Sequence, residues 1–579
     1  MLAPSFVLTA QKITNEKLLI SQTILHKHNA ASDTAVFSLA NAREKETTGL
    51  DTFLKNCRII DGSGAPPNPS GILIRGEKIE RIMAEPPDGF TGQVIDCEGA
   101  TVIPGIIDCH SHNDWFALSP DRHRFFDPFL LQGVTTFVAG NCGFSVPGYS
   151  ASTPFKDQIG GGLFTLDEAS AQTHQFEQWF RAVDGHCPAN IALLVGHGTA
   201  RIAINGNKDN PLNPEGKAAM LEQIELALQQ GACGVSLGLM YEPGLYAPKE
   251  ELIEVARLCA KYGKVLTVHS RACSAISLSY KRMARSHLLL ALDELADIVR
   301  ATGVRLQVSH LIFVGRRSWK DVRAATAILR KLKEEGYDVG FDLYPLDYGA
   351  SIITVVLPDW YQAMPLQQRR KWLNKLRLAA MVRVTTFLLG FNFSDIRIAW
   401  AGPGQEDLTG KTIAQIARER GIPELDAYLD VCEKSNFKAK VLMGSYQNEE
   451  IVRTLMRSDQ SLFMTDAWVE AEGKQNGSIY GAFPRFLSIA RAMGMPLEQA
   501  VAKMTGLTAR RFGLKDRGLI REGCYADLNV IDMDRLQDRI EQELPPTGIR
   551  YTFVNGTIVA RDGEMLPEWP EVGRALPVK

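Results

Sequence analysis

The sequence predicts an α/β protein, because short apolar runs typical of strands alternate with helical stretches through most of its 579 residues. Hydrophobic residues make up 45% and charged residues 22% of the chain, a composition typical of globular proteins. Eight candidate strands occur, and helical stretches between them, such as 217–231 and 322–336, end near a glycine. Eight strands alternating with helices predict a (β/α)8 TIM barrel. The competing Rossmann sheet lacks its glycine-rich phosphate turn here.

The candidate strands are residues 101–112, 133–143, 190–198, 231–239, 264–271, 305–313, 338–345 and 461–468. The seventh and eighth are separated by about 115 residues, far more than a usual connection. This gap contains IRIAWAG and KAKVLMGS, which resemble further strands. We therefore expect an inserted subdomain at about residues 350–455 that overhangs the barrel mouth and could serve as a lid.

The remaining regions predict two further parts. Residues 51–104 and 515–579 contain short β segments punctuated by glycine, so we expect one small β-sandwich assembled from both terminal regions around a barrel of residues 105–514. Residues 1–50 are polar and weakly periodic. They are interpreted as an extension, either a flexible tail or the product of an overcalled start codon.

Composition narrows the function classes. The net charge is −2 and no basic block interleaved with aromatics occurs, which argues against nucleic-acid binding. No apolar run is long enough to cross a bilayer, and the N-terminus does not resemble a signal peptide. The ten cysteines are scattered, so reduced thiols in a cytoplasmic protein without a membrane partner are expected. The oligomeric state stays open.

Ligand-type side chains stand at the ends of five of the eight candidate strands. They are His110, His112, Cys142, His269, His310 and Asp466. Because barrel active sites form at the carboxyl ends of the strands, these residues are expected to converge on one face. Two strand residues at positions i and i+2 point the same way, so both histidines of the first pair face the barrel axis. Imidazole and thiolate suit zinc, and a carboxylate can bind it or act as a base.

Each residue alone has a plainer interpretation. A single strand histidine is more often a hydrogen-bonded core residue, a single cysteine a small buried apolar side chain, and a single aspartate a helix cap. The occurrence of six ligand-type residues at five separate strand ends favours a metal site over these explanations. His26 and His28 also form a pair, but they lie in the polar extension and are interpreted as solvated. His197 could line the site or hold a loop.

With these residues and their surrounding motifs, the chain resembles the amidohydrolase superfamily, and within it the D-aminoacylase branch. The resemblance runs from about Phe53 to about Gly563 and rests on segments such as IIDGSGAP, VIPGIIDCHSHND, GVTTFVAGNCGFS, VGHGTAR, YGAFPRFL and TARRFGLKDRGLIREGCYADLNVID. It implies a metal-bridging cysteine, which Cys142 in GNCG matches. Strand four, GACGVSLGL, has no lysine that could be carboxylated in its place.

The resemblance also implies individual roles. Cys142, His269 and His310 would form a tight zinc site, while His110, His112 and Asp466 would form a weaker one that Cys142 bridges. Asp466 in MTDAW matches the family's catalytic aspartate. It would act as general base and then general acid for a metal-activated water.

Departures from the branch fall where its substrate carboxylate is held. Members of the branch usually have a lysine two residues after the strand-six histidine, where this chain has Ile312. They usually have an arginine shortly before the segment matching YGAFPR, where this chain has Ser478. Other cations would have to substitute, or the substrate lacks that carboxylate. Arg271 and Arg316, with its neighbour Arg317, are the candidate substitutes. Tyr344 in FDLYP matches a family position that contacts substrate.

The sequence therefore predicts a zinc hydrolase of linear amides, with N-acyl-D-amino acids as the default substrate class. A hydrolase of cyclic amides such as hydantoins or lactams is the alternative within the same chemistry. A barrel scaffold without catalysis is the alternative from a different class, although the complete ligand set argues against it.

Overall fold

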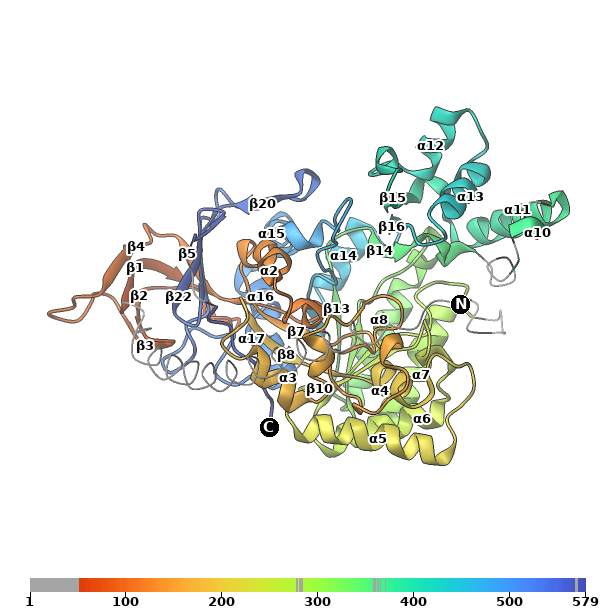
Figure 1. The fold of residues 1–579 in the computed structure, drawn as a ribbon. Coiled ribbons are helices and arrows are strands. Elements are labelled where there is room, and N and C mark those ends of the chain that lie inside the picture. Colours follow the sequence, from red (N-terminus) through yellow and green to blue (C-terminus); the bar gives the residue numbers. More distant parts are fainter. Residues whose placement is uncertain are drawn as a thin grey trace, which may run out of the picture.

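The computed structural model describes residues 51–277, 280, 285–357, 361, 364, 366–369, 371–567 and 571–579. The predicted extension, residues 1–50, therefore lies outside the described residues. Figure 1 shows three regions: a β-rich region at one end, a central α/β body, and a smaller helical region that projects from the body. None of the described helices is long and apolar enough to cross a membrane.

The α/β body is built on parallel strands. β6 (Ile106–Asp108), β7 (Val134–Ala139) and β8 (Asn190–Leu193) form one sheet. A second sheet has the order β17-β13-β12-β11-β10-β9. Its bounds are β9 Val195–Gly196, β10 Gly234–Gly238, β11 Val265–His269, β12 Arg305–Ser309, β13 Val339–Leu343 and β17 Ser461–Phe463. Only Leu194 separates β8 from β9, so the two sheets follow one another along the chain.

The outer strands β17 and β6 are joined by side-chain and loop hydrogen bonds. The buried carboxylate of Asp108 accepts from the backbone N–H of Thr465 at 3.1 Å and from its hydroxyl at 2.5 Å. The backbone N–H of Asp466 donates to the carbonyl of His110 at 3.2 Å. The carboxyl ends of the first and last parallel strands are therefore fixed beside each other.

Helices pack on the parallel strands through apolar faces. α8 (Val322–Glu334) is representative, because its buried residues Val322, Ala325, Leu329 and Leu332 recur every three or four positions. The other helices of the body are α2 Arg122–Leu131, α3 Phe176–Val183, α4 His197–Asn205, α5 Pro214–Gln229, α6 Lys249–Lys261, α7 His287–Thr302, α14 Glu449–Met456, α15 Ser478–Ala492, α16 Leu497–Lys503 and α17 Gly506–Phe512.

Both terminal regions contribute to a single nine-stranded sheet. Its order is β23-β22-β21-β18-β5-β1-β2-β3, with β4 paired to β1. The bounds are β1 Thr52–Ile59, β2 Asn68–Arg75, β3 Lys78–Met83, β4 Gln93–Asp96, β5 Thr101–Pro104, β18 Leu528–Ile531, β21 Ile549–Val554, β22 Thr557–Arg561 and β23 Glu564–Met565, with β19 Gln537–Arg539 and β20 Leu544–Thr547 forming a separate hairpin. The terminal regions join as expected, while their packing as a sandwich stays a prediction.

One expected strand, 101–112, is two strands in two different sheets. β5 pairs with β18 and β1 in the terminal sheet, whereas β6 pairs with β7 in the parallel sheet. Gly105 lies between them, and a Cβ there would meet the Thr135 hydroxyl oxygen at 2.2 Å. Only glycine fits this crossing point, which leads directly to His110 and His112.

The long connection between β13 and β17 has its own core. β14 (Gly349–Ile352), β16 (Lys440–Met443) and β15 (Ile396–Trp400) form a three-stranded antiparallel sheet. The helices are α10 Leu366–Arg369, α11 Trp372–Leu389, α12 Ile413–Arg420 and α13 Glu424–Lys434. Buried residues from the sheet and from α11, α12 and α13 form one separate hydrophobic cluster. Figure 1 shows this insert projecting beyond the body. Its boundaries at about 350–455 stay a prediction.

Candidate metal centre

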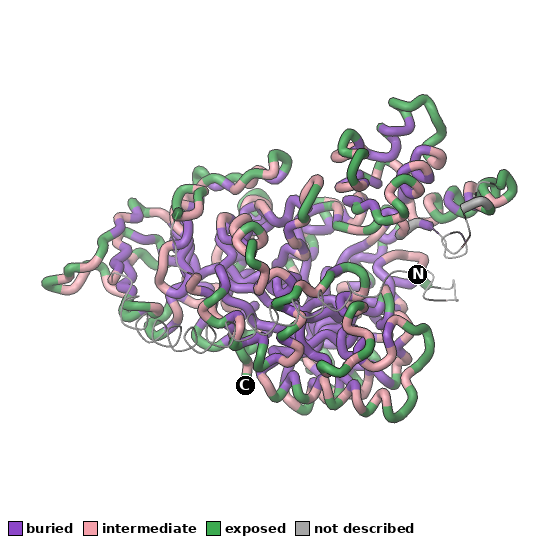
Figure 2. Tube along the Cα trace, viewed as in Figure 1, coloured by how far each residue is buried: buried purple, intermediate pink, exposed green. Residues whose placement is uncertain are grey.

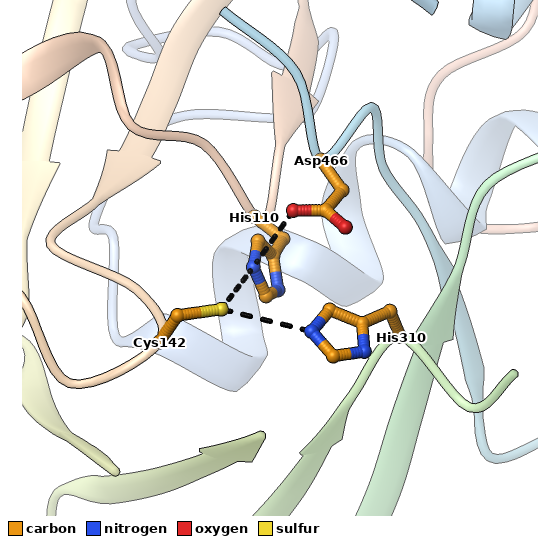
Figure 3. A group of neighbouring side chains, drawn as sticks. All are labelled: His110, Cys142, His310 and Asp466. Carbon is orange, nitrogen blue, oxygen red and sulfur yellow. Dashed lines mark hydrogen bonds and ion pairs between the residues drawn. The ribbon is translucent and has the colours of Figure 1, made fainter. Parts of the chain in front are cut away.

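Four of the six predicted ligand residues meet in one buried cluster at the carboxyl ends of the parallel strands (Figure 3). One ligand atom each from His110, Cys142, His310 and Asp466 lies within 4.8 Å of all the others. The Cys142 sulfur is 3.3 Å from Nε2 of His110 and 3.6 Å from Nε2 of His310. Nε2 of His110 is 3.4 Å from Oδ1 of Asp466. Two imidazoles, a thiol and a carboxylate therefore point toward a common centre.

The remaining two predicted residues border the same centre. Nδ1 of His269 lies 3.6 Å from the Cys142 sulfur, and Nε2 of His112 lies 3.6 Å from Oδ1 of Asp466. The His269 and His310 rings are 4.2 Å apart between centroids. Two groups thus share the cluster: His269 and His310 face the thiol, while His112 faces the carboxylate.

Three of these residues have backbone angles that side chains rarely adopt. The φ angles are +55° at Cys142, +32° at His310 and +49° at Asp466. Each residue comes shortly after a parallel strand, where the chain turns sharply out of the sheet. A left-handed conformation at a non-glycine residue costs free energy and clusters at functional sites. The fold therefore accepts backbone strain at three positions to aim these side chains at one point.

Buried groups that the sequence did not single out hold the cluster in place. Oδ1 of Asp342 accepts a hydrogen bond from the His310 backbone N–H at 2.6 Å and lies 3.4 Å from Nδ1 of His110. Its other oxygen accepts from the Gln307 amide at 3.0 Å. The Tyr241 hydroxyl donates to the Cys142 carbonyl at 2.7 Å. Asp342 thus orients one imidazole and fixes the backbone of another.

The charges of the cluster are mutually dependent. Burial raises the pKa of the Cys142 thiol, but His110, His112 and His269 outweigh burial and hold it well below its usual range. Burial likewise raises the pKa of Asp466, while His110 and His310 lower it to about 2. The thiol and the carboxyl are therefore both anions at neutral pH.

A metal dication fits this donor set. Without one, the two anions are balanced by protons on imidazoles: burial lowers the pKa of His110, but Cys142 and Asp466 raise it to about 10. A dication at the centre would replace those protons and bind deprotonated thiolate and neutral imidazole nitrogens. Nitrogen and sulfur donors of this kind suit zinc best among the common cations.

A cavity lies between the insert and the segment that follows Asp466. Its volume is about 350 Å³. The insert contributes β14 and β16 to one wall, and Ala467 and Trp468, the residues next to Asp466, contribute to the other. The Trp468 ring also lies 5.4 Å from the His112 ring between centroids. The cavity therefore offers room for a small organic molecule next to the segment that carries Asp466.

The arginines predicted to bind substrate have internal partners. Arg271 is paired with Glu294, at 3.0 Å from Nε to Oε2, and donates to the Leu245 carbonyl at 2.8 Å. Arg316 is paired with Asp395 through two hydrogen bonds of 2.8 and 3.0 Å. Arg317 donates to the Phe387 carbonyl. Substrate binding by these arginines stays a prediction, and their ion pairs weaken it.

The other substrate-side positions are apolar or aromatic. Tyr344 and Ile312 are buried in one hydrophobic cluster. Burial, then the nearby Asp466, raises the pKa of Tyr344 well above its usual range, so its hydroxyl stays protonated. Ser478 is buried at the start of α15, where its carbonyl accepts from the Gln132 amide at 2.9 Å. Tyr344 is thus placed near the site, and Ile312 and Ser478 bring no positive charge to it.

His197 belongs to a separate buried hydrogen-bonded group. Its Nε2 lies 2.8 Å from Oε1 of Glu251, which also accepts from Nε of Arg201 at 3.1 Å. All three side chains are buried, and His197 begins α4 instead of ending a strand. Of the two roles expected for His197, lining the site or holding a loop, these contacts favour the second.

Glu251→Gln is expected to lower the free energy of unfolding by about 3–5 kcal/mol, because it leaves the buried Arg201 guanidinium without its counterion. Burial raises the pKa of Glu251, but His197 and Arg201 outweigh it and lower the pKa. The stabilisation is therefore present at neutral pH and is lost as the pH falls. Denaturant unfolding at neutral and acidic pH measures both effects. Glu254→Gln on the same helix, which breaks a more exposed pair with Lys217, should cost less than about 1 kcal/mol.

Asp342→Asn is expected to lower metal affinity and activity about 10–100-fold, the usual effect of losing a carboxylate that orients metal-binding histidines. Metal titration of the apo protein measures the affinity. Asp338→Asn, which changes an exposed carboxylate four positions earlier, is the matched control and should leave both quantities near wild type. Unchanged affinity in the Asp342 variant would contradict the orienting role.

Comparisons with known proteins agree with this geometry. Residues 406–560 match the profile of the amidohydrolase family. D-aminoacylase from Alcaligenes xylosoxydans xylosoxydans is 30% identical over 525 residues, which cover 89% of this chain and 96% of that protein. N-acyl-D-glutamate deacylase from the same organism is 30% identical over 521 residues, which cover 88% and 93%.

Solved structures give the same result. The N-acyl-D-glutamate deacylase of Bordetella bronchiseptica, complexed with zinc and a phosphonate inhibitor, has a TM-score of 0.72 and 27% identity. The alignment covers 92% of this chain and all of that one. A D-hydantoinase structure has a TM-score of 0.54 at 14% identity, a likeness that shows the fold alone.

A mixed α/β fold with a buried His, Cys and Asp cluster at its strand ends defines a metal-dependent amidohydrolase. The chain belongs to the amidohydrolase superfamily and, within it, to the D-aminoacylase branch. It is a hydrolase that acts on carbon–nitrogen bonds other than peptide bonds.

Proposed function

We propose that the protein is a zinc-dependent deacylase that cleaves the linear amide of N-acylated amines, with N-acyl-D-amino acids as the default substrates. The observation that supports this most is the cluster in which ligand atoms of His110, Cys142, His310 and Asp466 lie within 4.8 Å of one another. The relatives named above supply the substrate class.

The residues divide into two sets in this proposal. Cys142, His269 and His310 would hold the tightly bound metal, while His110, His112 and Asp466, together with Cys142, would hold a second, weaker one. Zinc at this site supplies polarisation of the amide carbonyl and a bound water of lowered pKa. Zinc would thus be bound by a thiolate that the three imidazoles already stabilise.

Asp466 moves the proton. Its carboxylate is an anion at neutral pH, and it is 23% exposed beside the cavity that adjoins Ala467. It takes a proton from the attacking water and gives it to the nitrogen of the departing amine, which leaves well only when protonated. The Asp466–His112 contact of 3.6 Å keeps the carboxylate directed toward the cluster.

The architecture in this proposal is a (β/α)8 barrel. The eight parallel segments run in chain order, counting β8 and β9 as one, and the Asp108–Thr465 bonds join the last to the first. The barrel would comprise residues 105–514, flanked by a β domain from 51–104 and 515–579 and covered at its mouth by the insert. Closure of this kind places every proposed ligand on one rim.

We also propose that the protein binds its substrate without recognising a free carboxylate on the amine portion. A charge-assisted hydrogen bond contributes about 1.5–3 kcal/mol, so loss of a carboxylate held by a buried cation lowers kcat/KM roughly 10–150-fold. Arg271 and Arg316 are engaged by acidic partners. At the cavity rim, Lys440 pairs with Glu470 and Lys474 with Glu543.

The test is a substrate panel with the zinc-loaded full chain: N-acetyl amino acids of both hands, their methyl esters, and hydantoin and dihydrouracil. We expect turnover of linear amides and a change of less than about threefold on esterification, because no cation among the described residues that line the cavity is buried. A loss in the 10–150-fold range would contradict the carboxylate-independent site. Turnover of the cyclic amides alone would overturn the linear-amide proposal.

A further inference from the structure

One helix of the insert presents apolar side chains to solvent in a continuous stripe. On α11, the exposed fractions are 70% for Trp372, 60% for Leu373 and for Leu376, 56% for Val384 and 65% for Phe387. At 100° per residue, these positions fall within a sector of roughly 120°. The stripe therefore occupies one face of the helix over its whole length.

The opposite side of α11 is packed normally. Leu378 and Val382 are buried in the hydrophobic cluster of the insert. Lys375 forms an ion pair with Asp426 of α13 at 2.5 Å. A helix that packs on one side usually presents polar residues on the other. Here the second face is apolar as well, and Figure 2 shows α11 as an exposed segment at the projecting end of the insert.

The charged residues of α11 and of the sequence next to it have one sign. From residue 366 to residue 394 the sequence has six cations and no acidic residue. The cations are Arg369, Arg370, Lys371, Lys375, Arg377 and Arg383. Arg377 and Arg383 are exposed, and their positions fall beside and within the apolar sector. Long cationic side chains can lay their stems along apolar surface while their charged ends reach outward.

We propose that α11 docks this protein on the surface of an anionic lipid bilayer. An apolar face with Trp, Leu and Phe, flanked by Lys and Arg, is the pattern of helices that lie in the plane of the membrane interface. Charge complementarity selects this occupant: a second copy of the chain would oppose the cations of one helix to those of the other. That none of the described helices could cross a bilayer does not conflict with surface attachment.

α11 is connected to the metal centre through Arg317 and through the rest of the insert, so docking would affect the surroundings of that centre. Arg317, seven residues after His310, lies over the Phe387 ring at 4.4 Å and donates to its carbonyl at 2.7 Å. The same insert lines the cavity beside Asp466 through β14 and β16. Docking would therefore attach the part of the molecule that covers the site to the lipid surface.

The test measures co-sedimentation of the full-length zinc-loaded protein with vesicles of phosphatidylcholine alone or mixed with phosphatidylglycerol. We expect binding to the mixed vesicles that weakens as salt is added. The Leu376→Glu/Val384→Glu variant should bind at least about tenfold less, because two charges replace apolar side chains of the stripe. Leu226→Glu/Leu544→Glu, which changes exposed apolar residues on α5 and β20, is the matched control and should bind like wild type.

Thermal unfolding and hydrolysis of a soluble N-acetyl amino acid show whether each variant is folded. A chain that is folded but inactive still tests membrane docking, because vesicle binding does not depend on the proposed activity. Equal binding of both variants, or equal binding to both kinds of vesicle, would overturn the proposal. A monomer–dimer equilibrium that the stripe variant abolishes, without vesicle binding by wild type, would assign the face to a second copy instead.

Discussion

Asp466→Asn is expected to lower kcat by about 10²–10⁴-fold, the usual contribution of a positioned acid–base group. The amide keeps the shape of the side chain but cannot take a proton from water or return one to the amine. Metal should remain bound, because the groups facing the Cys142 sulfur at 3.6 Å, His269 and His310, are unchanged. Turnover of an N-acetyl amino acid and zinc content of the same preparation measure the two effects separately.

Asp459→Asn is the matched control for this variant. It changes a carboxylate seven positions earlier whose side chain is 75% exposed and paired with Lys333. Its activity should stay near that of wild type. The proton-transfer role of Asp466 fails if Asp466→Asn turns over substrate at a similar rate with full zinc occupancy.

Cys142→Ala is expected to release the tightly bound metal and abolish activity with it. The sulfur lies within 3.6 Å of nitrogens from three imidazoles, so its removal separates the two halves of the site. Because the pKa of the thiol is held well below its usual range, the protein also loses a thiolate at neutral pH. The affinity should fall by more than the roughly 100-fold that loss of a supporting residue can cause.

Cys259→Ala, at a buried cysteine on α6 outside the cluster, is the control for this experiment. Metal analysis after dialysis against a weak chelator should show zinc in wild type and in the control, and little in Cys142→Ala. Equal zinc in all three would refute the assignment of Cys142 as a ligand.

The candidate site could be predicted from the sequence because its chemistry lies at strand ends. A His-x-His pair and a Gly-flanked Cys142 stand out against apolar strands, and the barrel rule places them together. Asp342 could not be found in the same way, because it lies inside β13, where every residue is buried and no alternation marks its direction. Tyr241 resembles an ordinary loop aromatic until its bond to the Cys142 carbonyl is known.

The order of strands and helices was also predictable, since hydrophobic runs record burial. These runs do not indicate which strand or side chain each residue will contact. The run 102–107 is apolar throughout, and nothing in it records that β5 and β6 pair in two different sheets. His197 ends an apolar run as the proposed ligands do, yet its ring turns to Glu251 across 54 residues of sequence. Partner choice depends on tertiary packing, which a local pattern does not contain.

The crossing at Gly105 bears on how the enzyme matures. β5, which aims the segment carrying His110 and His112, lies between β1 and β18, and β18 is made long after β5. On the ribosome, this half of the centre must therefore wait for its last supporting strand. Metal can be captured in its final geometry only after β18 has been made. A chain that stops before β18 should consequently lose zinc retention before it loses the parallel strands.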